Sequence, residues 1–354
     1  MCIRDSTQED PCAGLAARER MATRVPDLDL FHPWNLGVEE AIDLAIVCEE
    51  VARTADARIV NSEGASVTTH TGLHVYGNSH GFIGGYPSSR HGISCAVVGR
   101  EGASTQRDYW WDSARCADDL APAEAIGRRA GERAAARLGA RQIPTRKAPA
   151  LFSAQVAAGL LRHLTHAITG ASLYRRESFL LDHLERKIFP DFVRISEEPL
   201  WLRGLGSAPF DGEGVATAPK DLVADGVLRS YLLDAYSARR LGMETTGNAG
   251  GVHNLRIRMG EMDRDALLRE LDTGLFVTEL MGHGINPVTG DYSRGAVGFW
   301  VENGELRFPV EEVTIAGNLK RMYQGLIAVG NDCDFPGSTR TGSWLIDQMT
   351  IAGH

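Results

Sequence analysis

The sequence predicts an α+β fold, with a mixed α/β N-terminal domain followed by a strand-rich, largely antiparallel C-terminal domain. Three observations support this class. Glycine accounts for 39 of the 354 residues, against a usual ~7%, and so many glycines indicate many turns. The second half of the chain alternates short apolar runs with turn residues, a pattern typical of strands. Asp225-Gly226 and Asn303-Gly304 each lie between two such runs and predict tight antiparallel hairpins.

The N-terminal half predicts two helices and a small sheet. Helical spacing of apolar residues predicts a first helix over Val38–Ala55, and Pro122 is expected to open a second that ends near Leu138. Between them, strands are expected at 57–60 and 66–70, joined by the turn Asn61–Gly64 and continued by 73–76, and again at 93–98 and 105–111. We expect Gly77–Gly92 to form a loop.

The composition changes at Arg141–Pro149, which carries basic residues and two prolines and which we take as a domain boundary. Ser153 is expected to cap a helix that runs through Ile168 and stops at Gly170. A further helix is predicted over Asp263–Leu271. The resulting division is an N-terminal domain over 7–145 and a C-terminal domain over 146–354.

Charge and composition exclude several classes of protein. The formal net charge of −9 argues against a nucleic-acid partner, because such proteins need a basic face to displace counterions. No run of about 18 apolar residues predicts a membrane-spanning helix. The start of the chain lacks the apolar core of a signal peptide, so we expect a cytoplasmic protein with no membrane partner. The six cysteines lack C-x-x-C spacing and are expected to be reduced thiols.

Several catalytic motifs are absent from the sequence. No G-x-x-x-x-G-K-[ST] loop, no G-x-S-x-G elbow and no H-E-x-x-H helix occurs. One pair with metal-ligand character remains, because His163 and His166 are three residues apart on a predicted helix and could face the same side. Zinc hydrolysis also needs a third ligand and a carboxylate base, and the neighbouring residue Arg162 is a cation. The alternative is one core-facing and one boundary histidine.

Polar residues in three segments are candidates for binding a peptide or another protein. A loop is a common place for binding residues, and backbone can approach a ligand closely at glycines. The alternatives are an ordered loop, a tight turn and a surface ion pair, respectively. The candidates are Asn78, His80, Tyr86, Arg90 and His91 in the first segment, Gly250, Gly251, His253 and Asn254 in the second, and Asp291 with Arg294 in the third.

Long motifs spread over the chain resemble the PmbA/TldD family of bacterial metallopeptidases. They include GNSHGF with GYPSSRH, PTRKAP, PFDGEGV, GNAGGVHN, TELMGHG and GDYSRGAVGFWVENGE. The resemblance runs from about Thr7 to His354, and GDYSRGA with GNAGG…HN is closer to the PmbA branch, also called TldE, than to the TldD branch. Residues 1–6 match nothing and are interpreted as an unrelated leader. We therefore expect the N-terminal domain to be truncated at its start.

The resemblance implies a peptidase of two different subunits. TldD-type chains carry H-E-x-x-x-H on a helix and a cysteine near the C-terminus, and they bind zinc. Matching that helix to the one ending HAITG puts Leu161 at the first histidine, Arg162 at the glutamate and His166 at the second histidine. The cysteine falls near Thr341, eight residues after Cys333. One histidine cannot hold zinc, so this chain is expected to have no cofactor and no catalytic residue of its own.

The leading hypothesis is a non-catalytic PmbA/TldE-type subunit that pairs with a TldD-type zinc subunit to cut small or unfolded peptides. A second hypothesis is a stand-alone zinc hydrolase that uses His163 and His166 with Cys333 or a nearby acid such as Asp182. A third is a protein that binds and modulates a nucleic-acid enzyme. The peptide substrate, the stoichiometry and a possible homodimer stay open.

Overall fold

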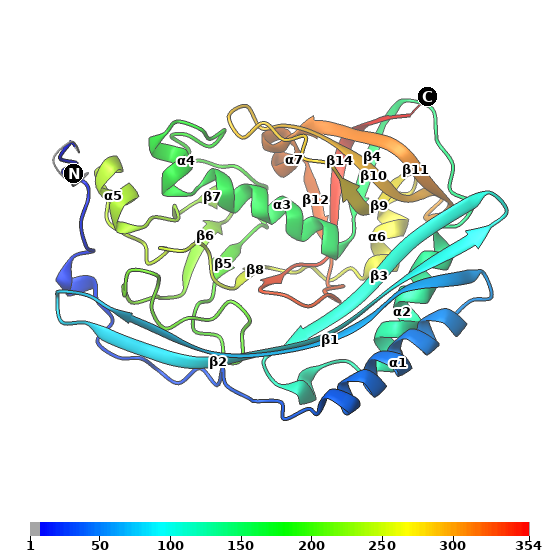
Figure 1. The fold of residues 1–354 in the computed structure, drawn as a ribbon. Helices are drawn as coiled ribbons and strands as arrows, with labels where there is room; N and C mark the ends of the chain where they lie inside the picture. The colour runs from blue at the N-terminus through cyan, green and yellow to red at the C-terminus, as the bar shows by residue number, and fades with distance from the viewer. Residues whose placement is uncertain (1–7, 354) are drawn as a thin grey trace.

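The first half of the chain forms a long three-stranded antiparallel sheet with two helices against it (Figure 1). The computed structural model describes residues 8–353, so the leader assigned to 1–6 lies outside the described residues. The sheet curves beneath the rest of the molecule, and the two helices cover one end of it. Its elements are α1 (Val38–Thr54), β1 (Ile59–Gly77), β2 (Ile83–Glu101), β3 (Ser104–Ala114) and α2 (Ala123–Ala136).

Two glycines let α1 and α2 pack with their backbones in close approach. A Cβ atom on Gly127 would lie 2.0 Å from the carbonyl oxygen of Cys48, and one on Gly131 would lie 2.4 Å from that of Ala52. The four-residue spacing places both glycines on one face of α2. The same contact buries Cys48 against Cys95 of β2 in the core of this half.

Replacing Gly127 with alanine is expected to destabilise the protein by about 1–3 kcal/mol, because the added methyl group would clash with the backbone of α1 at the Cys48 carbonyl. Gly159 in the helix α3 (Ala154–Ala167) is the matched control, since nothing lies within 4 Å of its Cβ position. Gly159→Ala is expected to stabilise the protein by up to about 1 kcal/mol. Urea unfolding of the two variants checks this, and equal midpoints would contradict the packing argument.

The second half contains two sheets. The six-stranded sheet has the order β11-β10-β9-β4-β14-β12 and curls so that β11 also pairs with β14; only β4 and β9 are parallel neighbours within it. The five-stranded sheet has the order β13-β8-β5-β6-β7. The strands of the first sheet are β4 (Arg146–Phe152), β9 (Gly274–Met281), β10 (Asp291–Glu302), β11 (Glu305–Asn318), β12 (Leu326–Val329) and β14 (Trp344–Ala352).

The five-stranded sheet is made of short segments, and five helices accompany the two sheets. Its strands are β5 (Ile195–Glu197), β6 (Lys220–Ala224), β7 (Val227–Leu228), β8 (Leu255–Ile257) and β13 (Thr339–Arg340). The helices are α3 (Ala154–Ala167), α4 (Gly170–Tyr174), α5 (Ala235–Leu241), α6 (Arg264–Leu271) and α7 (Leu319–Gln324).

The main core forms around α3. Leu160, Leu161 and Leu164 of this helix are fully buried in one cluster with Trp344 of β14 and Tyr323 of α7. The Tyr323 hydroxyl donates a hydrogen bond of 3.0 Å to the Leu160 carbonyl. The main core therefore fixes one face of α3 and leaves the opposite face toward solvent.

The α+β class is confirmed, and so are the predicted helices over α1, α2, α3 and α6 and the hairpins at Asp225-Gly226 and Asn303-Gly304. The hairpin predicted around Asn61–Gly64 is wrong. That segment instead carries irregularities within the continuous strand β1, and Gly64 takes a φ of +102° there. A glycine in a strand interior often marks a bulge, as here.

The loop predicted over Gly77–Gly92 is also wrong. The chain turns over Asn78–Phe82, closed by a 3.0 Å bond from the Asn78 amide to the Phe82 carbonyl, and β2 begins at Ile83. Gly170 does not end the helical region but begins α4. A Cβ there would lie 2.0 Å from the Ser237 hydroxyl oxygen, so this glycine serves the contact between α4 and α5.

Candidate functional site

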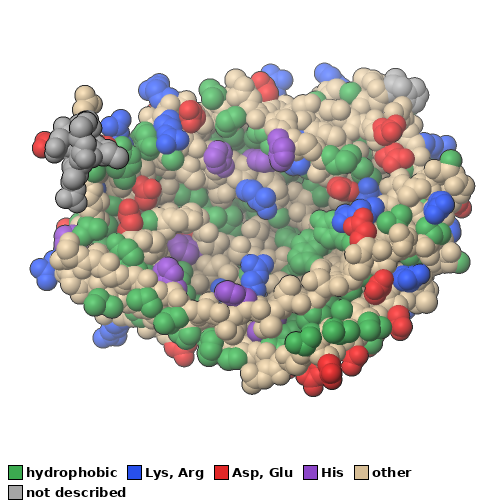
Figure 2. All heavy atoms as spheres, viewed as in Figure 1, with side chains coloured by type: hydrophobic (Ala, Val, Ile, Leu, Met, Phe, Trp, Pro, Cys, Tyr) green, Lys and Arg blue, Asp and Glu red, His purple; other side chains and the backbone are tan. Residues whose placement is uncertain are grey.

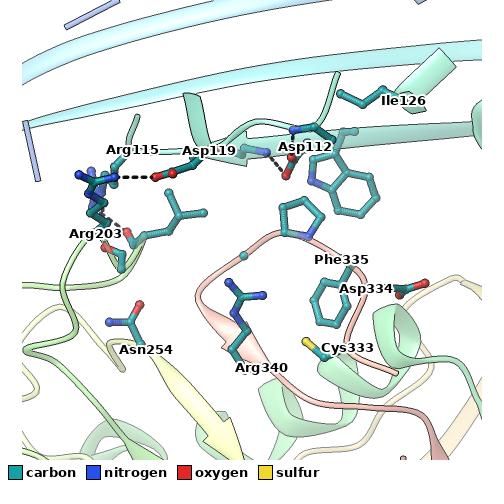
Figure 3. A pocket seen from close by; sticks show the side chains of 18 of the residues that line it. Asp112, Arg115, Asp119, Ile126, Arg203, Asn254, Cys333, Asp334, Phe335 and Arg340 are labelled. Atoms are coloured by element: carbon teal, nitrogen blue, oxygen red, sulfur yellow. Dashed lines mark hydrogen bonds and ion pairs between the residues drawn. The ribbon is translucent and has the colours of Figure 1, made fainter. Parts of the chain in front are cut away.

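A cavity of about 590 Å³ opens where three parts of the chain meet (Figure 3). The first part runs from the end of β3 to α2, the second is the loop 201–205, and the third is the segment 333–340 that leads into β13. Ligand cavities commonly have volumes of ~300–1,000 Å³. Because residues far apart in sequence form its walls, the cavity exists only in the folded chain.

Apolar side chains form much of the cavity wall. Trp110 and Phe335 are buried, whereas Trp201 and Leu202 are 41% and 63% exposed. Two arginines lie near the aromatic rings. The guanidinium of Arg129 is 3.6 Å from the centroid of the Trp110 ring, and that of Arg340 is 5.8 Å from the centroid of the Trp201 ring. Such cation–π contacts hold a guanidinium over an apolar wall.

Four arginines and three aspartates line the cavity, so it is slightly cationic in a protein of net charge −9. Arg115 donates to the carbonyls of Ser89 and Leu205 at 3.0 and 2.8 Å. Arg129 pairs with Asp334, and Asp112 accepts from the backbone amides of Ser113 and Ala121. Arg203 pairs with Asp119 of the lining and with Asp29. These partners fix most of the charged groups.

Asn254, one of the predicted candidates, lies in the cavity wall and is almost fully buried. Its side-chain oxygen accepts a 2.8 Å bond from the Gly206 amide. Its nitrogen donates to the Ser207 hydroxyl at 2.7 Å and to the Glu198 carbonyl at 2.8 Å. Asn254 therefore ties β8 to the loop that carries Trp201 and acts as a positioning residue of the cavity.

A buried ionic cluster lies next to Asn254. The fully buried carboxylate of Glu197 accepts 2.7 and 2.8 Å bonds from the backbone amide and ring Nδ1 of His253 and a 2.8 Å bond from Asn248, and it forms a 2.6 Å ion pair with Lys220. Burial alone raises the pKa of Glu197, but the His253 hydrogen bond and the Lys220 charge outweigh it, and the pKa is lowered. The predicted candidate His253 is thus a structural partner of Glu197.

A second carboxylate, Asp211, shapes the glycine-rich loop. It accepts backbone bonds from Glu213, Val215 and Ala249 at 2.9–3.0 Å, while burial raises its pKa. The adjoining predicted candidates Gly250 and Gly251 have φ values of +99° and +113°, and nothing lies within 4 Å of their Cβ positions.

The role of these glycines is therefore conformational, with open space beside them.

Sequence reasoning missed Glu197, Lys220 and Asp211. The signal for Asp211 was DGEG, a carboxylate followed by turn glycines.

The five candidates expected together on the Gly77–Gly92 loop are separated instead. Asn78 and His80 lie in the turn, whereas Tyr86, Arg90 and His91 are on β2. His91 is buried, and its Nε2–H donates to the His32 carbonyl at 2.8 Å while its Nδ1 accepts from the Thr69 hydroxyl at 2.9 Å.

The remaining members of this group lie along the ribbon. Arg90 donates to the Ser113 hydroxyl at 3.0 Å, and Tyr86 packs edge-on against Phe210. Alternation along β2 places Tyr86 and Arg90 on one face of the strand, four residues and about 13 Å apart, and His91 on the other face, so the group forms no common site.

Asp291 and Arg294 do not pair with each other, contrary to the alternative considered from sequence. Asp291 accepts bonds from the Thr289 hydroxyl at 2.7 Å and the Asn318 amide at 3.0 Å. The Arg294 side chain donates to the carbonyl of Leu280 at 3.1 Å. Its charge helps to lower the pKa of His163 on α3.

The molecule is hollowed between the β1–β2 ribbon and α3, and histidine and arginine side chains lie in the hollow (Figure 2). On α3, His163 is mostly buried beside the ring of Tyr292, and His166 is exposed. Burial first, and then the charges of Arg294 and Arg162, lower the pKa of His163 to about 4, so its ring is neutral at pH 7.

These residues do not fit a zinc site. Across residues 8–353, no three His, Cys, Asp or Glu side chains gather closely enough to hold a metal ion. Cys333 lines the cavity of Figure 3, whereas neither His163 nor His166 does. Zinc in proteins needs at least three such ligands, and the pair on α3 has no third.

Within residues 8–353, no helix has the length and apolar character needed to cross a bilayer.

Comparison with known proteins identifies the family. A family model described as the PmbA/TldA metallopeptidase C-terminal domain matches residues 145–353, and the model of the central domain matches 31–138. The chain is 49% identical to metalloprotease PmbA of Escherichia coli O157:H7, covering 98% of this chain and 77% of that protein. It is 45% identical to a metalloprotease PmbA homolog of Haemophilus influenzae, covering 100% and 79%.

Solved structures agree with this result. A candidate modulator of DNA gyrase from Bacteroides thetaiotaomicron superposes with a TM-score of 0.93 at 30% identity, covering 99% of this chain and 80% of that one. TldE from Thermococcus kodakarensis shares the fold, with a TM-score of 0.81 at 22% identity, covering 99% and 82%. The chain therefore belongs to the PmbA/TldD family of metallopeptidases, and the resemblance inferred from its sequence is confirmed.

Proposed function

We propose that this chain is the non-catalytic PmbA/TldE-type subunit of a cytoplasmic metallopeptidase that acts on small or unfolded peptides. One observation carries the proposal. On α3, which the sequence resemblance matches to the zinc helix of TldD-type chains, Leu161 is fully buried in the core and Arg162 is exposed, at the positions of a zinc ligand and the general base. A buried leucine cannot bind zinc, and a guanidinium cannot accept the proton of a zinc-bound water.

In this proposal a TldD-type partner supplies the zinc that activates water and polarises the scissile carbonyl. This chain contributes the surfaces that bind the peptide, namely the open cavity and the hollow beside α3. Both belong to a fold that its relatives share. The names of those relatives, metalloprotease PmbA and TldE, support a peptidase-related role. Because one face of α3 is fixed in the core, the chain can present the other face to a bound substrate without a metal of its own.

The test combines elemental analysis with reconstitution. Purified alone, the chain is expected to contain far less than one zinc per molecule and to cut no unfolded peptide. Mixed with the TldD-type chain of the same organism, it is expected to co-elute in size-exclusion chromatography and to give peptidase activity that a chelator abolishes. The double variant His163→Ala and His166→Ala is the control and is expected to leave the activity of the mixture and the zinc content unchanged.

Two results would contradict the proposal. About one zinc per isolated chain, lost in the histidine variants, would establish the stand-alone hydrolase. Failure to bind a TldD-type chain, together with retention of a topoisomerase from a lysate, would favour a modulator of that enzyme, and the net charge of −9 would then point to contact with protein and not with DNA.

A further inference from the structure

Among the described residues, 8–353, one cation in the cavity of Figure 3 has no counter-charge. Arg340 ends the short edge strand β13, and its side chain points into the cavity. Throughout residues 8–353 no carboxylate or carbonyl accepts a hydrogen bond from its guanidinium, whose only close aromatic neighbour is the exposed ring of Trp201 at 5.8 Å. The other three lining arginines are all engaged by carboxylates or carbonyls.

The lining aspartates cannot serve as partners for Arg340. Asp334 forms an ion pair with Arg129, and Asp119 forms one with Arg203. Asp112 uses both oxygens to accept backbone amides at 2.7 Å. The side-chain amide of Asn254 is likewise fully hydrogen-bonded, to Gly206 and Ser207 of the loop 204–207 and to the Glu198 carbonyl. The cavity therefore presents one uncommitted guanidinium surrounded by groups that are already satisfied.

The surroundings of Arg340 are apolar. Trp201 and Leu202 are large side chains left exposed at the mouth, and Phe335 and Trp110 close the inner wall. A ligand that suits both features carries a carboxylate next to an apolar or aromatic group, since a guanidinium binds a carboxylate in a bidentate manner and an indole ring packs on an apolar side chain.

We propose that this cavity binds the C-terminus of a peptide whose last residue is apolar or aromatic, with Arg340 holding the terminal carboxylate and Trp201 and Phe335 contacting the last side chain. The choice of a peptide as the ligand rests on the proposed function. The role of Arg340 follows from the charges and contacts of the cavity. A C-terminus suits the site better than an internal residue, because the chain end places the carboxylate and the last side chain on one carbon atom.

The test measures binding to the isolated full chain by fluorescence polarisation, with no partner present. The probes are fluorescein-labelled Ala-Ala-Ala-Phe with a free C-terminal acid, the same peptide as its C-terminal amide, and the amide of Ala-Ala-Asp-Phe. The free acid is expected to bind about 10- to 100-fold more tightly than either amide, the range for charge-assisted hydrogen bonds. Arg340→Gln is expected to remove this difference.

Two further variants separate the contributions. Arg258→Gln is the matched control, because Arg258 is exposed near the same sheet but outside the cavity lining, and it is expected to leave all affinities unchanged. Trp201→Ala is expected to weaken the acid and the amide alike, preserving their ratio. Equal affinity for acid and amide, tight binding of the internal aspartate peptide, or full affinity in Arg340→Gln would each overturn the inference.

Failure of this inference and failure of the proposed function have different signatures. If the chain prefers the free acid but the two-chain mixture has no activity, the carboxylate site is supported and the proposed peptidase function is contradicted. If the mixture is active but the chain binds acid and amide equally, the proposed function is supported and the carboxylate site is contradicted. Comparing the affinities of the free acid and the amide for the unaltered protein already tests the carboxylate site, so the result does not depend on how any variant folds.

Discussion

Replacing Glu197 with alanine is expected to lower the free energy of unfolding by about 3–5 kcal/mol, because it leaves Lys220 without its buried counter-charge and His253 without its hydrogen-bond acceptor. The carboxylate is fully buried, and its partners come from β6 and from the segment just before β8. The loss should also release Asn248, which donates 2.8 Å to the same oxygen as His253. Urea unfolding monitored by circular dichroism measures the change.

Glu198 provides the control, since it is the next residue, is only half-buried, and makes no side-chain ion pair within residues 8–353. Glu198→Gln is expected to change stability by less than about 0.5 kcal/mol. A Glu197→Ala variant as stable as Glu198→Gln would contradict the expected stabilisation by the buried carboxylate and its partners.

The same residue predicts a pH dependence with a definite sign. The pKa of Glu197 is lowered in the folded protein, because the His253 hydrogen bond and the Lys220 charge outweigh the effect of burial. Folding therefore favours the ionised form, and its contribution is complete above the unfolded pKa of about 4.3. The stability difference between the protein and Glu197→Gln should be constant near neutral pH and shrink as the pH falls below that value.

Sequence reasoning succeeded where the signal was local. The periodicity of α1 and α2 and the turn pairs Asp225-Gly226 and Asn303-Gly304 specify structure through neighbouring residues alone. It failed on the β1–β2 ribbon, because Gly64 reads equally well as a hairpin turn or as an irregularity within a strand. The choice between them depends on pairing with β2 residues more than 30 positions away, which no local pattern reports.

The candidate site was predicted less well than the fold. Asn254 was identified, but as one of several polar residues, and Arg340 and Trp201 were not singled out at all. Neither lies in a recognisable motif, and both matter only because the segment 333–340 comes next to the loop 201–205 in the folded chain. Likewise, Glu197 is unremarkable among 46 acidic residues until its burial is known.

Arg137→Met is expected to lower stability by about 3 kcal/mol, because Arg137 joins the two halves of the molecule. The residue follows α2 and is almost buried. Its guanidinium lies 2.6 Å from the carboxylate of Glu279 on β9, 3.4 Å from that of Asp108 on β3, and 3.1 Å from the Arg107 carbonyl. Without it, the buried Asp108 keeps the 2.7 Å bond from the Tyr109 amide and, within residues 8–353, one charged partner, Arg133 at 3.1 Å.

The loss should also weaken the coupling between the halves, because β3 and β9 belong to different sheets. We expect unfolding curves from tryptophan fluorescence and from far-ultraviolet circular dichroism to coincide in the unaltered protein and to separate in Arg137→Met. Arg128→Met is the control on the same helix, since Arg128 is exposed and, in residues 8–353, forms no ion pair. Coincident curves in both variants would show that packing between the halves, and not this arginine, couples them.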